Sequence, residues 1–280
     1  MNKATGDAAS GEVFEREETV VAWDEDYYHP IAEKYYDRAV PDMLKAMGAR
    51  AGDLVLDAGC GPGVHSVRAA RYGAKMRAVD LSSVMLSHAR ARARQAGLDG
   101  AISFSQDDLT RLSLDSGAYP FVFSWGVIIH VPDAEAALDH LARVTAPGGR
   151  LALHVLGKDS LDDLVEGLAR RLLRKPLKDR VETALGYGHW YDFNNERLWV
   201  QRFDIGKLER AMAGRGMRAI GRRGAEFSEL QRRAPKVLRP LLLLVNGLAY
   251  ALRLPASFFC TQIIIFEQTR DRRGEPASTS

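Results

Sequence analysis

A carboxylate and a run of glycines stand together at the end of a predicted strand. The segment VLDAGCGPG, residues 55–63, places Asp57 two residues before Gly59, with Gly61 and Gly63 at the next alternate positions. A glycine-rich turn after a strand lets the backbone approach a ligand closely. Because a buried carboxylate is costly without a partner, Asp57 predicts either a cationic ligand group or donation from the loop's own N–H groups.

A second acid follows this loop at the distance expected of a ribose-binding residue. Asp80 ends the next predicted strand, where a carboxylate can accept hydrogen bonds from both hydroxyls of a ribose. The dinucleotide pattern G-x-G-x-x-G is not met, since its third glycine falls at Val64, and no GK[ST] of a Walker loop follows. An acid at Asp57 would also repel a pyrophosphate. The ligand implied is a nucleoside whose other end is cationic.

The elements that must position these acids predict a doubly wound α/β fold. From residue 54 onwards, apolar strand-like runs alternate with helix-like stretches, which indicates a Rossmann-like, mostly parallel sheet with helices on both faces. The first five strands are expected to start near residues 54, 76, 101, 120 and 150. Pro147-Gly148-Gly149 is expected to break the helix before the fifth strand. Two later strands complete a seven-stranded sheet, with helical insertions after strands five and six.

The composition of the chain predicts five segments. We expect a flexible polar lead at 1–29 and a disordered tail at 270–280. Between them lie the ligand-binding core at 30–156, a helical and aromatic insertion at 157–203, and the rest of the core at 204–269, which contains a helical insertion at 228–254.

Composition and charge narrow the class of protein. The 280 residues carry a net charge of +3 and only two cysteines, Cys60 and Cys260, without the spacing of a metal or redox site. The first residues contain no apolar stretch of a signal peptide. The longest apolar run, Leu241 to Leu254, is too short to span a bilayer. We therefore expect a cytoplasmic protein without a metal site.

At this point the chain resembles the class I S-adenosylmethionine (SAM)-dependent methyltransferases of the small-molecule type. VLDAGCGPG is similar to their first motif, and AVDLSSVML, SQDDLTRL, WGVIIHVPD and APGGRLALHV are similar to later ones. The resemblance covers residues 30–156 firmly and 200–269 more loosely. One departure is Tyr119-Pro120, where the fourth strand of this family commonly opens with Phe-Asp.

The resemblance implies SAM as the cofactor and a role for each acid. Asp80 would bind the ribose, Asp108 or its neighbour Asp107 the adenine amine with Leu109 against the ring, and Asp57 would orient the methionine amine through the loop. The full set of expected cofactor contacts is Tyr36, Asp57, Gly59, Cys60, Gly61, Gly63, Asp80, Leu81, Met85, Asp107, Asp108, Leu109 and Trp125. For Tyr36, helical spacing makes plain core packing an alternative.

Two histidines are candidates for a catalytic base. His130 follows the fourth strand near the expected cofactor site, and His189 lies in an aromatic loop with Trp190 and Tyr191, which we predict to contact the acceptor as part of a lid. A purely structural role is the alternative for each histidine and for the aromatic cluster. The favoured reaction is O-methylation of a small hydrophobic or aromatic metabolite. N- or C-methylation of a lipid-like or natural-product acceptor, and SAM binding without catalysis, are the alternatives.

Basic and apolar residues gather in the two insertions. A basic stretch alternates with leucines and ends near Arg180, and the apolar run from Leu241 to Leu254 has an arginine at either end. The basic residues are Arg170, Arg171, Arg174, Lys175, Lys178 and Arg180. Such helices are either solvated or lie on an anionic membrane. Peripheral membrane contact is therefore one expectation, nucleic acid is not expected as a partner, and the oligomeric state is left open.

Overall fold

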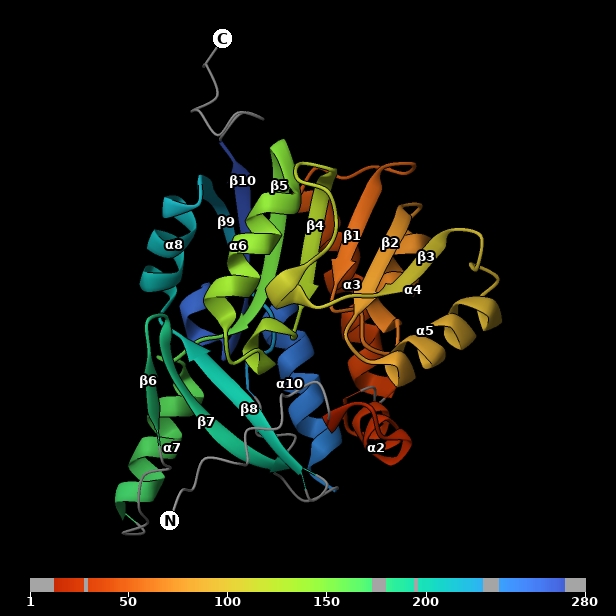
Figure 1. The fold of residues 1–280 in the computed structure, drawn as a ribbon. Helices are drawn as coiled ribbons and strands as arrows, with labels where there is room; N and C mark the ends of the chain where they lie inside the picture. The colour runs from red at the N-terminus through yellow and green to blue at the C-terminus, as the bar shows by residue number, and fades with distance from the viewer. Residues whose placement is uncertain (1–12, 28–29, 173–179, 194–195, 229–236, 270–280) are drawn as a thin grey trace, which may run out of the picture.

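The computed structural model describes residues 13–27, 30–172, 180–193, 196–228 and 237–269 (Figure 1). Its centre is a sheet of seven strands in the order β3-β2-β1-β4-β5-β10-β9. The strands are β1 (Leu54–Ala58), β2 (Lys75–Asp80), β3 (Ile102–Gln106), β4 (Tyr119–Trp125), β5 (Thr145–Leu156), β9 (Met217–Gly224) and β10 (Thr261–Gln268). Only β10 runs antiparallel to its neighbours. The strand order reverses between β1 and β4, which is where ligands bind in such sheets.

Helices cover both faces of this sheet, which confirms the predicted fold class (Figure 1). The chain alternates its apolar residues between the two faces, so that Val55 packs in one core cluster and Leu56 in the other. The first cluster joins the sheet to α3 (Pro30–Ala46), α4 (Val64–Arg71), α5 (Ser83–Gln95) and α10 (Arg239–Ala251). The second joins it to α6 (Ala134–Val144) and α8 (Ile205–Gly214).

The fifth strand begins earlier than predicted. Helix α6 ends at Val144 and β5 starts at Thr145, so Pro147-Gly148-Gly149 lies inside the strand. The hydroxyl of Thr145 donates to the carbonyl of Leu141 at 2.7 Å and so caps the last turn of the helix. On the facing strand, the register shifts between Tyr119 and Phe121, at a proline that has no N–H to donate.

The insertion after β5 is a helix followed by a small sheet. Helix α7 (Leu161–Leu172) confirms the helical part, and β6 (Val181–Thr183), β7 (Gly186–Phe193) and β8 (Glu196–Phe203) form an antiparallel sheet of their own. The prediction of an aromatic loop is therefore wrong. Trp190 lies opposite Trp199 in the β7–β8 pair, with ring centroids 5.4 Å apart. A Cβ on Gly188 would come within 1.9 Å of the Trp199 ring, so this glycine makes room for a side chain instead of forming a hinge.

The prediction of a flexible lead at 1–29 is wrong for the part that the structure describes. Residues 17–27 form helix α2 (Glu17–Tyr27), and Val20 is fully buried. The carbonyl of Phe14 accepts from the hydroxyl of Ser82 at 2.6 Å, and both carboxylate oxygens of Glu15 accept from Ser83 at 2.9 Å. These bonds join the segment before α2 to the start of α5.

Three short 3-10 helices complete the described chain, namely η1 (Leu109–Arg111), η2 (Ile128–His130) and η3 (Ala256–Phe258). Within the described ranges, no helix is long and apolar enough to cross a bilayer. The expected disordered tail at 270–280 and the basic residues Arg174, Lys175 and Lys178 lie outside those ranges.

Candidate active site

One cavity of about 180 Å³ lies where the strand order reverses, at the carboxyl ends of β1, β2 and β4. It brings together residues that are far apart in the sequence, from Phe14 before α2 to Thr261, the first residue of β10. The lining residues are Phe14, Trp23, Tyr36, Asp57, Gly59, Cys60, Gly61, Pro62, His65, Asp80, Leu81, Ser82, Met85, Asp107, Asp108, Leu109, Trp125, Gly126, Val127, Ile129, His130, Val131, His154, Glu226 and Thr261. All the expected cofactor contacts except Gly63 are among them.

The glycines between β1 and α4 serve three different purposes. Gly59 (φ 86°) packs against Val127, whose side chain would lie 2.4 Å from an added Cβ. Gly61 (φ 50°) has nothing within 4 Å of such a Cβ, so this position leaves space at the cavity. Gly63 (φ 77°) caps α4 and lies against Ala89 of α5, at 2.8 Å from an added Cβ. Gly63 thus acts through helix packing, whereas Gly61 opens the backbone to a ligand.

Asp57 is a buried acid at the end of β1. Its Oδ2 accepts a hydrogen bond from the Ser66 hydroxyl at 2.5 Å, and its side chain is almost fully enclosed. The pKa of Asp57 is raised to about 7, mainly by burial; the Ser66 hydrogen bond acts against this rise, and the charge of Asp80 contributes to it. A cationic ligand group beside this carboxyl would favour its ionised form.

Asp80 is held by two backbone donors at the end of β2. Its Oδ2 accepts from the Gly61 N–H at 2.7 Å and its Oδ1 from the Ser82 N–H at 3.0 Å. Burial raises the pKa of Asp80, and these two N–H donors act in the opposite direction. The carboxylate therefore bridges the glycine loop and the first residues before α5. Each of its oxygens keeps a lone pair that a ligand hydroxyl can use.

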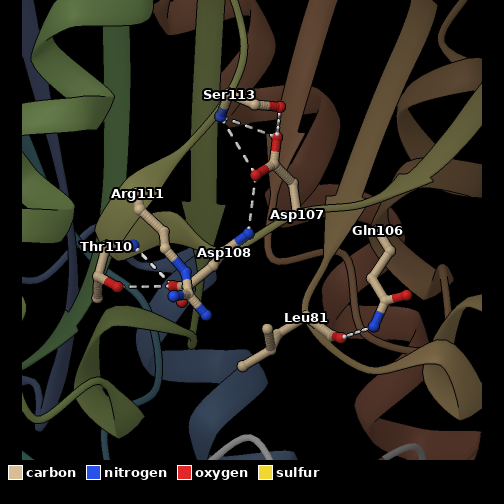
Figure 2. A network of polar contacts seen from close by, with 7 residues as sticks. All are labelled: Leu81, Gln106, Asp107, Asp108, Thr110, Arg111 and Ser113. Atoms are coloured by element: carbon tan, nitrogen blue, oxygen red, sulfur yellow. Dashed lines mark hydrogen bonds and ion pairs between the residues drawn. The ribbon is translucent and has the colours of Figure 1, made fainter.

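The two acids after β3 shape the turn in which they lie, as Figure 2 shows. Asp107 accepts from the N–H and hydroxyl of Ser113, whereas Asp108 accepts from the N–H and hydroxyl of Thr110. Asp108 also forms an ion pair with Arg111 at 3.1 Å. Both acids line the cavity, so the choice between them for the adenine amine stays open.

An aromatic stack forms the inner wall of the cavity. The Trp125 ring lies parallel to His154, with centroids 4.7 Å apart, and His65 packs on Trp125 at 4.8 Å. Burial lowers the pKa of His65 well below its usual range, with the charge of Arg68 acting in the same direction. His65 is therefore neutral at pH 7, and this wall carries no charge from it.

A buried tyrosine and a glutamate stand next to this stack. The Tyr36 hydroxyl donates to Oε1 of Glu226 at 2.8 Å, and the Tyr36 ring packs edge-on against His65 at 5.1 Å. Both Tyr36 and Glu226 are at least nine-tenths buried and line the cavity. Tyr36 therefore packs in the core and also lines the cavity, so the two interpretations of this residue are compatible. Whether it contacts the cofactor stays a prediction.

The mouth of the cavity is aromatic. Trp23 of α2 makes edge-on ring contacts with Phe14 at 5.1 Å, His130 at 5.4 Å and Phe193 of β7 at 5.5 Å. The Nδ1 of His130 lies 2.8 Å from the carbonyl oxygen of Trp199. Since a carbonyl only accepts, Nδ1 carries the hydrogen and Nε2 the lone pair of the neutral ring.

Three expected site residues do not line this cavity. His189 is buried in β7 opposite Val200, Trp190 packs on Trp199, and Tyr191 is 45% exposed. His189 thus lies outside the cavity that His130 lines. The role of these three residues in acceptor binding stays a prediction.

Comparison with known proteins identifies the family. A profile described as "Methyltransferase domain" matches residues 55–149. A malonyl-[acyl-carrier protein] O-methyltransferase of Serratia marcescens is 35% identical over 200 residues, which cover 68% of this chain and 75% of that protein. The chain belongs to the class I SAM-dependent methyltransferases. Its cofactor is accordingly SAM.

Other relatives agree with this family over shorter stretches. Methyltransferase GfsG of Streptomyces halstedii is 33% identical over 137 residues, 48% of this chain and 49% of GfsG. The chain thus spans about half the length of that curated relative. A magnesium protoporphyrin IX methyltransferase from Synechocystis PCC 6803 has the same fold, with a TM-score of 0.61 at 19% identity over 92% of this chain and 97% of that one.

The donors and acceptors of the cavity fit SAM. SAM carries an ammonium and a sulfonium, and Asp57 is a buried acid whose ionised form a cation would stabilise. Asp80 offers its remaining lone pairs to the ribose hydroxyls, and the open space at Gly61 admits the ligand beside the backbone. Asp57 lies two residues before the glycine loop and Asp80 accepts a hydrogen bond from Gly61 within it, so one ligand can meet both.

Among the lining residues with aromatic or ionisable side chains, sequence reasoning missed five: Phe14, Trp23, His65, His154 and Glu226. His154 had a usable signal, since it is a polar residue in the otherwise apolar strand LALHVL. The same argument had identified Asp57 as a site residue. Glu226 had no such signal, because it follows β9 in the sequence and lies at the cavity only as a result of the strand order in the sheet.

Proposed function

We propose that this methyltransferase transfers the methyl group of SAM to a hydroxyl oxygen of a small, hydrophobic or aromatic metabolite. The observation that carries this proposal is that one cavity is lined by two kinds of residue. Asp57, Asp80 and the glycine loop offer carboxylates and open backbone, and Trp125, Trp23 and Phe14 offer aromatic rings. The acids and the loop suit the cofactor, and the aromatic rings suit a hydrophobic acceptor.

For an in-line displacement, the protein must mainly align the acceptor with the methyl group and the sulfur and exclude water from the site. Bound SAM supplies a methyl group on a positively charged sulfur, a good leaving group. Trp125 is held by ring contacts with His65 and His154, so it is a rigid part of the cavity lining. Trp23 and Phe14 narrow the mouth and keep water from the reacting atoms.

His130 is the residue best placed to take the proton of an acceptor hydroxyl. Its Nδ1–H is fixed by the Trp199 carbonyl, so Nε2 is the basic atom. In the reaction, the oxygen forms its bond to the methyl carbon, the carbon–sulfur bond breaks with its electron pair left on sulfur, and the hydroxyl proton passes to Nε2. An amine acceptor would need no such base once it is neutral.

The names of several relatives support an oxygen acceptor. Besides the Serratia enzyme, relatives include the O-methyltransferase resE of Aspergillus sclerotiorum, 30% identical over 146 residues, and the 27-O-demethylrifamycin SV methyltransferase of Amycolatopsis mediterranei, 30% identical over 139 residues. These names describe those proteins, and each alignment spans about half of the relative. Since each of these names refers to methylation at oxygen, they favour an oxygen acceptor for this chain.

A panel of matched acceptors tests this function. The enzyme is incubated with methyl-labelled SAM and with pairs of compounds that share one aromatic skeleton and differ only in a hydroxyl or an amino group. We expect label in the hydroxyl compounds, and less in their amino partners. Label only in the amino compounds would overturn the oxygen preference, and label only in added protein or RNA would overturn the small-molecule acceptor.

A further inference from the structure

Exposed apolar side chains concentrate on α10 and the residues around it. Among the described residues, nine of the 19 exposed large apolar side chains belong to the short segment 237–258. We call these nine residues the α10 surface; they are Val237, Leu238, Leu241, Leu244, Val245, Leu248, Leu252, Leu254 and Phe258, with 38% to 83% of each side chain exposed. A contiguous apolar surface of this kind marks a contact site for a protein or a membrane.

The opposite side of α10 is fixed to the body of the enzyme. The Asn246 side chain donates to the carbonyl of Ser228 at 3.0 Å and accepts from its N–H at 2.9 Å. The Tyr250 hydroxyl donates to Asp42 at 3.1 Å, and its ring packs edge-on against Tyr35 at 5.1 Å. The leucines are therefore held outward by specific contacts, because a rotation of the helix would break these bonds.

The α10 surface lies at the same end of the molecule as the cavity. Helix α10 follows β9, which runs parallel to β5, so both it and α7 stand beyond the carboxyl ends of the strands (Figure 1). Ser228, which Asn246 holds, is two residues after Glu226 of the cavity wall. Helix α7 adds four exposed apolar residues at this end, namely Leu164, Val165, Leu168 and Leu172.

Charge distinguishes a lipid surface from a second copy of the chain. Residues 237–258 contain two arginines, Arg239 and Arg253, and no acid. In a two-fold dimer the same patch meets itself, so this segment would offer its arginines no carboxylate. Its residues are also aliphatic with a single phenylalanine, whereas protein interfaces favour Tyr, Trp and Met. Leucines with arginines at either end match an apolar membrane interior under anionic headgroups.

We propose that the α10 surface docks this enzyme on an anionic lipid surface. The leucines enter the boundary between headgroups and acyl chains, and Arg239 and Arg253 meet lipid phosphates at the two ends of the helix. Docking at this end places the cavity close to the membrane. An acceptor dissolved in the lipid then reaches the site without crossing much water.

Vesicle sedimentation tests this docking on the full chain. The probes are vesicles of phosphatidylcholine alone and of phosphatidylcholine with an equal part of phosphatidylglycerol. The variant Leu244→Glu/Leu248→Glu places two acids on exposed positions one helical turn apart, and Ile220→Glu puts an acid on an exposed residue of β9 as a matched control. We expect the wild type and the control to bind the anionic vesicles, and the double variant to bind at least tenfold more weakly.

Three outcomes would overturn membrane docking. One is a wild type that binds neither vesicle, and another is a double variant that binds as the wild type does. The third is a wild type that is dimeric in solution with a monomeric double variant, which would make the α10 surface a dimer interface. Calorimetric titration with SAM is run on the same samples. Unchanged SAM affinity shows that the double variant is folded, and separates failure of docking from failure of the proposed function.

Discussion

Replacement of Asp57 by asparagine tests the electrostatics of the site directly. The amide has the shape of the carboxyl group, and its oxygen can still accept the hydrogen bond that Ser66 donates at 2.5 Å. What changes is the charge. In the cofactor-free enzyme we expect Asp57→Asn to stabilise the fold at pH 8, because a buried carboxylate without a cation is costly to ionise.

The pKa of Asp57 sets the size of the effect and its pH window. A carboxyl group with a pKa of about 7 in the folded chain and 3.8 in the unfolded chain costs about 4 kcal/mol when fully ionised, as an upper limit. Between these two values the folded chain holds a proton that the unfolded chain has released. Wild-type stability therefore falls as pH rises from about 4 to about 7, and the asparagine variant lacks this loss.

Chemical unfolding at pH 5, 6, 7 and 8 measures this effect. The free-energy difference between Asp57→Asn and wild type should be smallest at pH 5 and largest at pH 8. Asp99→Asn, which removes an exposed carboxylate, is the control for the change in net charge and should show no such trend. A difference that is the same at every pH would refute the burial argument, because Asp57 would then ionise as it does in the unfolded chain.

Binding of the cofactor should reverse the sign of the same substitution. With SAM present, the ammonium neutralises Asp57, so the wild type gains the charge pair that the variant cannot form. We expect Asp57→Asn to weaken SAM binding by about 1–3 kcal/mol. Wild-type binding at pH 7 should also release protons, seen as a dependence of the calorimetric heat on the buffer. Equal affinity in both proteins would place the ammonium elsewhere.

Three further substitutions probe the rest of the cavity. Asp80→Ala should weaken SAM binding by about 1–3 kcal/mol in a calorimetric titration, since two backbone donors and the ribose lose their acceptor; unchanged affinity would contradict the ribose role. His130→Gln should lower kcat for a hydroxyl acceptor by about 10²–10⁴-fold and remove the acid limb of the pH profile, and an intact profile would exclude it as the base. Trp23→Ala, which deletes ring contacts at the mouth, should raise the acceptor KM by about tenfold, unless the acceptor binds elsewhere.

The cofactor side of the site was predictable because its parts are local in sequence. Strand, glycine turn and helix follow one another over residues 54–71, and Asp80 closes the next strand, so local patterns suffice to place the acids. The structure then shows the separate role of each glycine, which local sequence patterns do not reveal. Gly59 and Gly63 are required by their packing on Val127 and Ala89, and only Gly61 opens towards the ligand.

The aromatic part of the cavity was predictable only in part, because it is assembled from distant segments. Trp125 and Tyr36 were expected in the site, whereas their neighbours His65, His154 and Glu226 were not. Their proximity follows from the strand order, in which β10 enters between β5 and β9. Polar and apolar residues alternate in the segment 186–203, but its glycines and aromatic residues favoured the prediction of a loop. In the structure β7 pairs with β8, and Trp190 packs on Trp199 across this pair.

Aromatic side chains from the start of the described chain line the cavity beside its acidic residues. Phe14 and Trp23 are in the lining, and Trp23 packs on Phe193 of the insertion in which the sequence predicted a lid. That lid stays a prediction. The segment that carries Phe14 is bonded to Ser82 and Ser83, directly after Asp80, the residue predicted to bind the ribose. Direct hydrogen bonds therefore join the aromatic residues of the cavity to the segment that carries one of its acids.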